Sequence, residues 1–354
     1  MRRFRIAFVA FIALPLAGCV SLMLARQVVT PPNQSGAKAM FSDSQIVKSA
    51  PTAFWQVGKV RSGPPAADLA FAVIEPGDYG FEYDLAISQA AGREPRIDRL
   101  KASWRPAGEV VRTARPSRGT LLLLHGYMQD KRFTTPWAIR LAQEGFRCVL
   151  LDLRGHGDSS GEHISFGAFE AADVSTVLDE LGRLGWDVSR VGLLGISYGA
   201  SVALLAAGRD ARVVAVVAFE PFASAETAVP ELMRAAFAAR ARGISDSQFA
   251  AAHRKQARVA GFDWADADIP AALARTRAPV LFLHGQRDTW LSPEHSRKLM
   301  RHAPAGSVLK LLPEDTHVTL PLRIETFGRE VAGWFGAAFD STTRVAIGAT
   351  FTEP

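Results

Sequence analysis

The five residues 195–199, Gly-Ile-Ser-Tyr-Gly, combine a hydroxyl side chain with the small neighbours that a sharp turn needs. They lie between an apolar run, residues 191–194, and an alanine-rich segment of helical composition, residues 200–207. Only small residues at positions −2 and +2 tolerate the strained backbone and close approach of a strand-to-helix turn. The pattern therefore predicts that Ser197 is an exposed nucleophile; the alternative is a glycine-rich turn with a surface serine.

A serine hydroxyl is a poor nucleophile until an imidazole removes its proton, and the imidazole needs a carboxylate to fix its tautomer. Both partners follow Ser197 in the chain, each after a short apolar segment. Asp288 ends the sequence HGQRD after residues 279–283, and His317 lies in the loop after residues 307–312. The order serine, acid, histidine is the one that a serine hydrolase of this kind requires.

These motifs, together with the turn His125-Gly126-Tyr127 after the apolar residues 120–124, resemble the α/β-hydrolase superfamily from about residue 99 to about residue 339. The resemblance implies roles for three side chains. Ser197 would be the nucleophile, His317 the general base and then acid, and Asp288 the group that orients His317. Glu220 is an alternative acid, because some family members carry the acid at the end of the sixth strand.

Negative charge develops on the substrate carbonyl oxygen, and backbone N–H groups must already point at it. In the family these donors come from the residue after the nucleophile and from the turn after the first parallel strand. Here the resemblance implies Tyr198 and Tyr127, with Met128 as a substitute for Tyr127. It implies no cofactor.

Elements that could position these residues alternate along the chain. Strand-like runs at residues 147–152, 190–194 and 213–219 alternate with helical segments such as 168–184, which predicts an α/β fold with a mostly parallel central sheet and helices on both faces. The carboxyl ends of such strands meet at one edge, where Tyr127, Ser197, Asp288 and His317 would collect. Residues 99–105 and 109–112 are predicted to supply leading antiparallel strands.

Residues 222–275 interrupt this alternation and predict a helical cap. The segment is rich in alanine and arginine and contains no strand-like run. Its apolar side chains could line an acyl or alcohol pocket, or could pack the cap onto the body: Leu232, Met233, Phe237, Phe249, Phe262 and Trp264. The predicted organisation is a signal segment (1–18), a lipid anchor and tether (19–40), an N-terminal extension (41–98), the hydrolase domain (99–339) and a poorly ordered tail (340–354).

The N-terminus carries a second signal. Three arginines in the first five residues precede an apolar run that ends in Leu-Ala-Gly-Cys at residues 16–19. This resembles a bacterial lipoprotein signal, which implies cleavage before Cys19, lipidation of Cys19 and an exported protein attached to a membrane of the cell envelope. Residues 4–24 are also long enough to span a bilayer as an uncleaved helix, and ordinary secretion is a third alternative.

The remaining composition excludes several classes of function. The formal net charge of +6 falls to about +3 without Arg2, Arg3 and Arg5, which does not favour nucleic-acid binding. The eight histidines show no metal-ligand spacing. Four of them are interpreted as turn formers: His125, His156, His163 and His284. The other cysteine, Cys148, lies in an apolar run and is interpreted as a core residue.

The sequence thus predicts a serine hydrolase that cleaves carboxylic esters or related small acyl compounds through an acyl-serine intermediate. A peptidase or amidase with the same three residues is the alternative enzyme, because pocket shape selects the leaving group. A non-catalytic binding or scaffold protein on a hydrolase fold is the alternative from another class.

Overall fold

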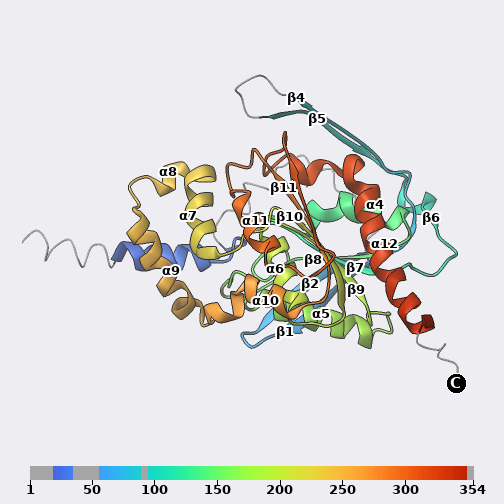
Figure 1. The fold of residues 1–354 in the computed structure, drawn as a ribbon, viewed down its shortest axis with the longest axis horizontal. Helices are drawn as coiled ribbons and strands as arrows, with labels where there is room; N and C mark the ends of the chain where they lie inside the picture. Colours follow the sequence, from blue (N-terminus) through green and yellow to red (C-terminus); the bar gives the residue numbers. More distant parts are fainter. Residues whose placement is uncertain (1–18, 35–55, 89–94, 349–354) are drawn as a thin grey trace, which may run out of the picture.

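The computed structural model describes residues 19–34, 56–88 and 95–348. Its centre is an eight-stranded sheet with the order β1-β2-β8-β7-β9-β10-β11-β12 (Figure 1). The strands are β1 (Gln56–Ser62), β2 (Ala67–Ile74), β7 (Thr120–Leu124), β8 (Arg147–Leu151), β9 (Val191–Ile196), β10 (Val213–Phe219), β11 (Val280–Gly285) and β12 (Val308–Leu312). From β8 to β12 all neighbours are parallel, so the prediction of a mostly parallel sheet is confirmed.

The apolar runs of the parallel strands are buried on both faces, as helices on both sides require. In β7, Leu121 and Leu123 join one hydrophobic cluster, and Leu122 and Leu124 join the other. The first cluster lies under α4 (Thr135–Gln143) and α12 (Ile324–Gly348). The second lies under α5 (Glu170–Arg183), α6 (Tyr198–Ala207), α10 (Ile269–Arg275) and α11 (Glu294–Met300).

The leading antiparallel strands differ from the prediction, because β1 and β2 fill this place instead of residues 99–112. The sequence of β2, ADLAFAVI, buries nearly every side chain, which suits a position inside a sheet covered on both faces. In contrast, β5 (Arg96–Ser103) mixes charged and apolar residues and pairs only with β4 (Glu82–Ser88), in a hairpin that projects from the body (Figure 1). The short strands β3 (Gly77–Asp78) and β6 (Val111–Arg112) form another pair.

The cap predicted for residues 222–275 is helical in the structure. It contains α7 (Ala225–Ala236), α8 (Ala238–Ala241) and α9 (Asp246–Ala260). Ser245 and Gln248 form a capping box at the start of α9, and Gly261 ends it in the left-handed conformation with φ 77°. The last helix of this segment, α10, packs against α6 on the body. Short 3-10 helices complete the fold: η1 (Ala107–Glu109), η2 (Lys131–Thr134), η3 (Trp264–Ala267) and η4 (Leu320–Leu322).

Residues 19–29 form a helix beside the cap, drawn in blue in Figure 1. Its residues 21, 24, 25, 28 and 29 are buried, which is the spacing of one helical face. Lys255 of α9 donates from Nζ to Ser21 Oγ at 2.6 Å. The following loop is also attached, since the Asn33 side chain donates to the Ser159 carbonyl at 2.8 Å. Residues 19–34 are therefore packed against the protein, where the sequence predicted an anchor and tether.

Two terminal predictions fall partly outside the described ranges. Residues 1–18 of the predicted signal lie outside them, and no helix within 19–34, 56–88 or 95–348 is long and apolar enough to cross a membrane. At the other end, α12 continues to Gly348, past the start of the predicted poorly ordered tail at residue 340. Its apolar residues Val331 and Phe335 are buried against the sheet and anchor the helix.

Candidate active site

Ser197 lies at the turn between β9 and α6 in a strained backbone conformation, with φ 52° and ψ −112°. The flanking glycines are required by contact. A Cβ on Gly195 would lie 2.3 Å from the Gly199 carbonyl oxygen, and a Cβ on Gly199 would lie 2.3 Å from that of Leu124. The Ser197 amide donates to the Phe219 carbonyl at 2.7 Å, which ties the turn to β10. The predicted strand-to-helix turn is therefore present, and the backbone of its serine is strained.

The structure brings Ser197, Asp288 and His317 together. The distance from Ser197 Oγ to His317 Nε2 is 2.9 Å, and from His317 Nδ1 to Asp288 Oδ2 it is 2.6 Å. Asp288 Oδ1 accepts hydrogen bonds from the amides of Trp290 and Leu291, at 2.8 and 2.9 Å. The imidazole is thus held with Nδ1–H on the carboxylate and with Nε2 ready to accept the serine proton.

Asp288 is kept ionised by its surroundings. Burial alone would raise its pKa, but the interactions with His317 and His284 outweigh burial and hold the pKa well below its usual range. His284 Nε2 lies 3.2 Å from Asp288 Oδ2 and 3.1 Å from the Leu291 carbonyl oxygen. Since both neighbours are acceptors, Nε2 carries the proton, and Nδ1 accepts from Ser296 at 2.7 Å. The sequence marked His284 only as a turn former and gave no sign of this contact with Asp288.

Glu220, the alternative acid, also lies close to the imidazole of His317. Its Oε2 is 3.5 Å from His317 Nδ1, which is longer than a normal hydrogen bond. The side chain is fully buried, and neither carboxyl oxygen makes a well-formed hydrogen bond within the described part of the chain. Burial and the nearby negative charge of Asp288 raise the pKa of Glu220 well above its usual value. The short contact with His317 thus belongs to Asp288, and the raised pKa of Glu220 favours its neutral form.

Glu220, Asp288 and His317 form the one group of possible metal ligands in the described residues, with donor atoms within 4.8 Å of one another. Nδ1 of His317 is already bonded to Asp288 at 2.6 Å. Burial and the charge of Asp288 raise the pKa of Glu220. The bond between His317 and Asp288 accounts for the close approach of these groups.

The two predicted oxyanion donors lie beside the serine. Tyr198 is the first residue of α6, where a backbone N–H has no acceptor within its own helix. Tyr127 lies in the turn after β7, and the next residue, Met128, has a φ of 61°. The Gln129 side chain accepts from the Gly126 amide at 2.8 Å and closes this turn. Tyr127, Tyr198 and Ser197 line one cavity.

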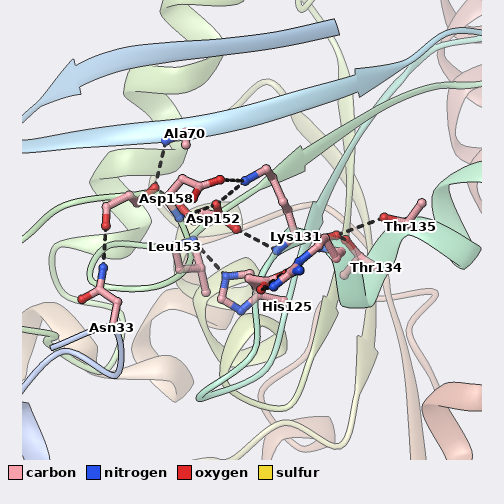
Figure 2. A network of polar contacts seen from close by, with 12 residues as sticks. Asn33, Ala70, His125, Lys131, Thr134, Thr135, Asp152, Leu153 and Asp158 are labelled. Atoms are coloured by element: carbon pink, nitrogen blue, oxygen red, sulfur yellow. Dashed lines mark hydrogen bonds and ion pairs between the residues drawn. The ribbon is translucent and has the colours of Figure 1, made fainter. Parts of the chain in front are cut away.

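A buried ion pair holds this turn against the loop after β8 (Figure 2). Lys131 Nζ lies 2.5 Å from Asp152 Oδ2 and 2.7 Å from Asp158 Oδ2. His125 accepts from the Leu153 amide at 3.0 Å through Nε2 and contacts the Gly126 carbonyl at 2.8 Å through Nδ1. These contacts fix both ends of residues 125–131 and so position the Tyr127 amide.

His125 and His156 are not proton carriers. Burial lowers the pKa of His125 to about 4 and that of His156 to about 3, so both are neutral near pH 7. His156 contacts the Arg154 carbonyl at 2.8 Å within its own loop. His156 thus acts within its own turn, as the sequence indicated, whereas His125 also accepts from Leu153 in the loop after β8.

Two cavities meet at Ser197, with volumes of about 360 and 490 Å³. Of the predicted cap residues, Leu232 and Phe237 line both cavities and Met233 lines the first. The other three pack elsewhere: Phe249 is buried in the core, and Trp264 contacts Phe262 and stacks on His253 at a centroid distance of 4.0 Å. Three of the six residues thus line the cavities and the other three pack the cap, while an acyl or alcohol pocket stays a prediction.

Residues 121–332, more than half of the chain, match the model of a family described as the alpha/beta hydrolase family. The chain belongs to this α/β-hydrolase family. Its fold class is the one predicted from the GxSxG and HGxxD motifs, with the sheet and helices in the expected layers.

Solved structures agree with the fold of this α/β-hydrolase. An esterase of Pyrococcus furiosus is similar with a TM-score of 0.53 and 17% identity, covering 81% of this chain and 91% of that one. A 2,6-dihydroxy-pseudo-oxynicotine hydrolase is similar with a TM-score of 0.54 and 16% identity, covering 84% of this chain and 72% of that one. At these identities the similarity concerns the fold alone. No curated protein sequence matches the chain significantly.

Proposed function

We propose that this α/β-hydrolase is a serine hydrolase that cleaves carboxylic esters through an acyl-serine intermediate. One observation carries the proposal: the unbroken series of contacts from Ser197 Oγ through His317 to Asp288, at 2.9 and 2.6 Å. The series starts at a strained turn and opens into apolar cavities. A scaffold protein would have no need of the strain or of the ionised, buried carboxylate.

In the proposed reaction each of these groups has a stated step. Ser197 Oγ attacks the carbonyl carbon while His317 Nε2 takes its proton, and the amides of Tyr127 and Tyr198 stabilise the oxyanion. The C–O bond to the alcohol then breaks, and Nε2 returns the proton to the leaving oxygen. Water adds to the acyl carbon in the second half, giving a proton to Nε2. The bond from the acyl carbon to Oγ breaks, and Oγ regains that proton.

The proposed location is the cell envelope, with the catalytic domain exported and attached to a membrane through lipidated Cys19. Cys19 is exposed at the start of the helix that packs beside the cap. Ser21 and Leu24 of that helix are buried against the protein. A lipid on Cys19 would thus reach the bilayer while the following residues stay on the body, so the active site would lie close to the membrane surface.

The experiment is a substrate panel for the purified protein: p-nitrophenyl esters of different acyl length against aminoacyl anilides, with Ser197→Ala as the control. Ester turnover that disappears in Ser197→Ala supports the proposal. Anilide turnover exceeding ester turnover would favour the peptidase, and turnover that persists in Ser197→Ala would place the chemistry elsewhere.

A further inference from the structure

The two cavities that meet at Ser197 are closed by different segments of the chain. The helix-side arm, of about 360 Å³, has Val28 of the N-terminal helix and Phe222 in its wall. The hairpin-side arm, of about 490 Å³, has Ile97 and Leu100 of β5 in its wall. Both volumes are in the range of small-molecule sites, about 300–1,000 Å³. Three of these residues lie outside residues 121–332, the part of the chain that matches the family model: Val28, Ile97 and Leu100.

His317 lines the hairpin-side arm but not the helix-side arm. In ester cleavage the imidazole that takes the serine proton must return it to the leaving oxygen, so the alcohol group must lie on the side of His317. The acyl chain extends from the other side of the carbonyl carbon. It therefore enters the helix-side arm, where Tyr198, the residue after the nucleophile, also lines the wall.

Neither arm offers a partner for a charged substrate group. Among the residues that the structure describes, the walls of both arms contain no lysine, arginine, aspartate or glutamate. Val28 and Leu100 are each only 9% exposed, so both are fixed parts of the wall. A charge carried into either arm would lose its hydration without gaining a counterion, which is unfavourable.

Resting on the proposed function, we propose that the substrates are neutral esters with apolar groups on both sides of the carbonyl. The acyl chain lies in the helix-side arm, against Val28, and the alcohol chain lies in the hairpin-side arm, against Leu100. The N-terminal helix and β5 are therefore specificity elements, one for each half of the ester.

The two arms have different kinetic consequences. The alcohol leaves when the acyl-enzyme forms, so the hairpin-side arm is empty of substrate during deacylation. The acyl chain stays on Ser197 through both steps. A change in the hairpin-side arm thus alters acylation alone, whereas a change in the helix-side arm alters acylation and deacylation.

Two variants of the full chain narrow the arms separately: Val28→Phe narrows the helix-side arm, and Leu100→Phe narrows the hairpin-side arm. Two ester series are used: p-nitrophenyl esters of increasing acyl length, and acetate esters of increasing n-alkyl alcohol length followed by pH-stat. Each methylene excluded from an arm should lower kcat/KM about fourfold, so excluding three should lower it about fifty-fold. Val28→Phe should do this for long acyl chains only, and Leu100→Phe for long alcohols only.

Matched controls place the same ring on exposed positions of the same elements: Leu22→Phe on the N-terminal helix and Lys101→Phe on β5. Both controls should leave the two length profiles unchanged. Val28→Ala and Leu100→Ala widen the arms and should move the preferred length upward in the same separate way, which keeps the test valid if a phenylalanine variant does not fold. The deacylation rate constant after a p-nitrophenyl burst should stay unchanged in Leu100→Phe.

Three results would overturn the inference: an exchange of the two effects, an equal effect of either variant on both series, or a slower deacylation in Leu100→Phe. A wild-type protein that hydrolyses neither ester series would contradict the proposed function itself, and the inference with it. Turnover of both series with the expected separation supports both.

Discussion

Replacing Asp288 by asparagine should remove catalysis while leaving the fold intact. The amides of Trp290 and Leu291 both donate to Oδ1, so they will retain the asparagine carbonyl oxygen at that place. The asparagine NH₂ group then faces His317 Nδ1, which must accept. The imidazole proton moves to Nε2, where it blocks acceptance of the serine proton. This tautomer change costs about ten-thousandfold in kcat, or roughly 5.4 kcal/mol of transition-state stabilisation.

Glu220→Gln is the matched control, because it makes the same change in the carboxyl group 3.5 Å from the same nitrogen. Glu220 is already neutral, so an amide replaces a neutral acid, and kcat should fall by less than about tenfold. The assay is the initial rate on p-nitrophenyl esters at pH 7, with circular dichroism and Tm as checks of folding. If Glu220→Gln lowered kcat several thousandfold while Asp288→Asn kept a kcat near that of the wild type, Glu220 and not Asp288 would be the acid that orients His317.

Three further predictions use other contacts. Lys131→Met leaves Asp152 as a buried charge without its main partner and should lower the free energy of unfolding by about 3–5 kcal/mol in urea titrations; a change below 1 kcal/mol would mean that the ion pair does not hold the turn. The pKa of Glu220 is raised in the folded state, so the stability that Glu220 contributes to the wild type is present at pH 4 and is lost as pH rises. The Tm of Glu220→Gln relative to that of the wild type should therefore increase between pH 4.5 and 8. A difference in Tm that stays constant with pH would contradict the raised pKa. Phe237→Ala should change the chain-length preference, because Phe237 lines both cavities, whereas Trp264→Ala should lower Tm and leave that preference unchanged, because Trp264 lines neither. Chain-length profiles and melting curves of both variants decide this.

The parallel half of the sheet could be predicted because its signal is local. Residues 120–124 and 280–283 are apolar runs that are each followed by a histidine and a glycine, and the turn at Ser197 needs glycines on both sides. Chain order and the common edge of parallel strands then bring Ser197, Asp288 and His317 together, as the contacts show.

The remaining features depend on contacts between distant segments, which no local pattern encodes. β2 pairs with β8 across 74 to 80 residues, from Ile74↔Cys148 to Phe71↔Leu151, whereas the sequence analysis predicts the leading strands in the nearer residues 99–112. The helix at residues 19–29 is not predicted, because these residues resemble the end of a signal sequence and its tether. Its buried positions nevertheless follow helical spacing. The sequence named both Asp288 and Glu220 as possible acids, and the distances from His317 Nδ1 that separate them, 2.6 and 3.5 Å, depend on the packing of the loops.

The proposed location of the protein in the cell envelope depends on lipidation of Cys19 and needs its own measurement. The mass of the N-terminal peptide of the mature protein distinguishes the models. A diacylglyceryl-modified Cys19 at the new terminus is the expected result, because two or three acyl chains hold a protein stably on a membrane. An unmodified peptide that retains residues 2–18 would instead favour an uncleaved helix.

Covalent labelling of the nucleophile tests the central claim most directly. The protein is treated with a fluorophosphonate probe, digested and analysed by mass spectrometry, alongside Ser197→Ala. We expect one adduct, on the peptide that contains Ser197, with loss of labelling and about a million-fold loss of ester turnover in Ser197→Ala. Labelling of Ser197→Ala, or an adduct on another residue of the wild type, would contradict the assignment of Ser197 as the nucleophile.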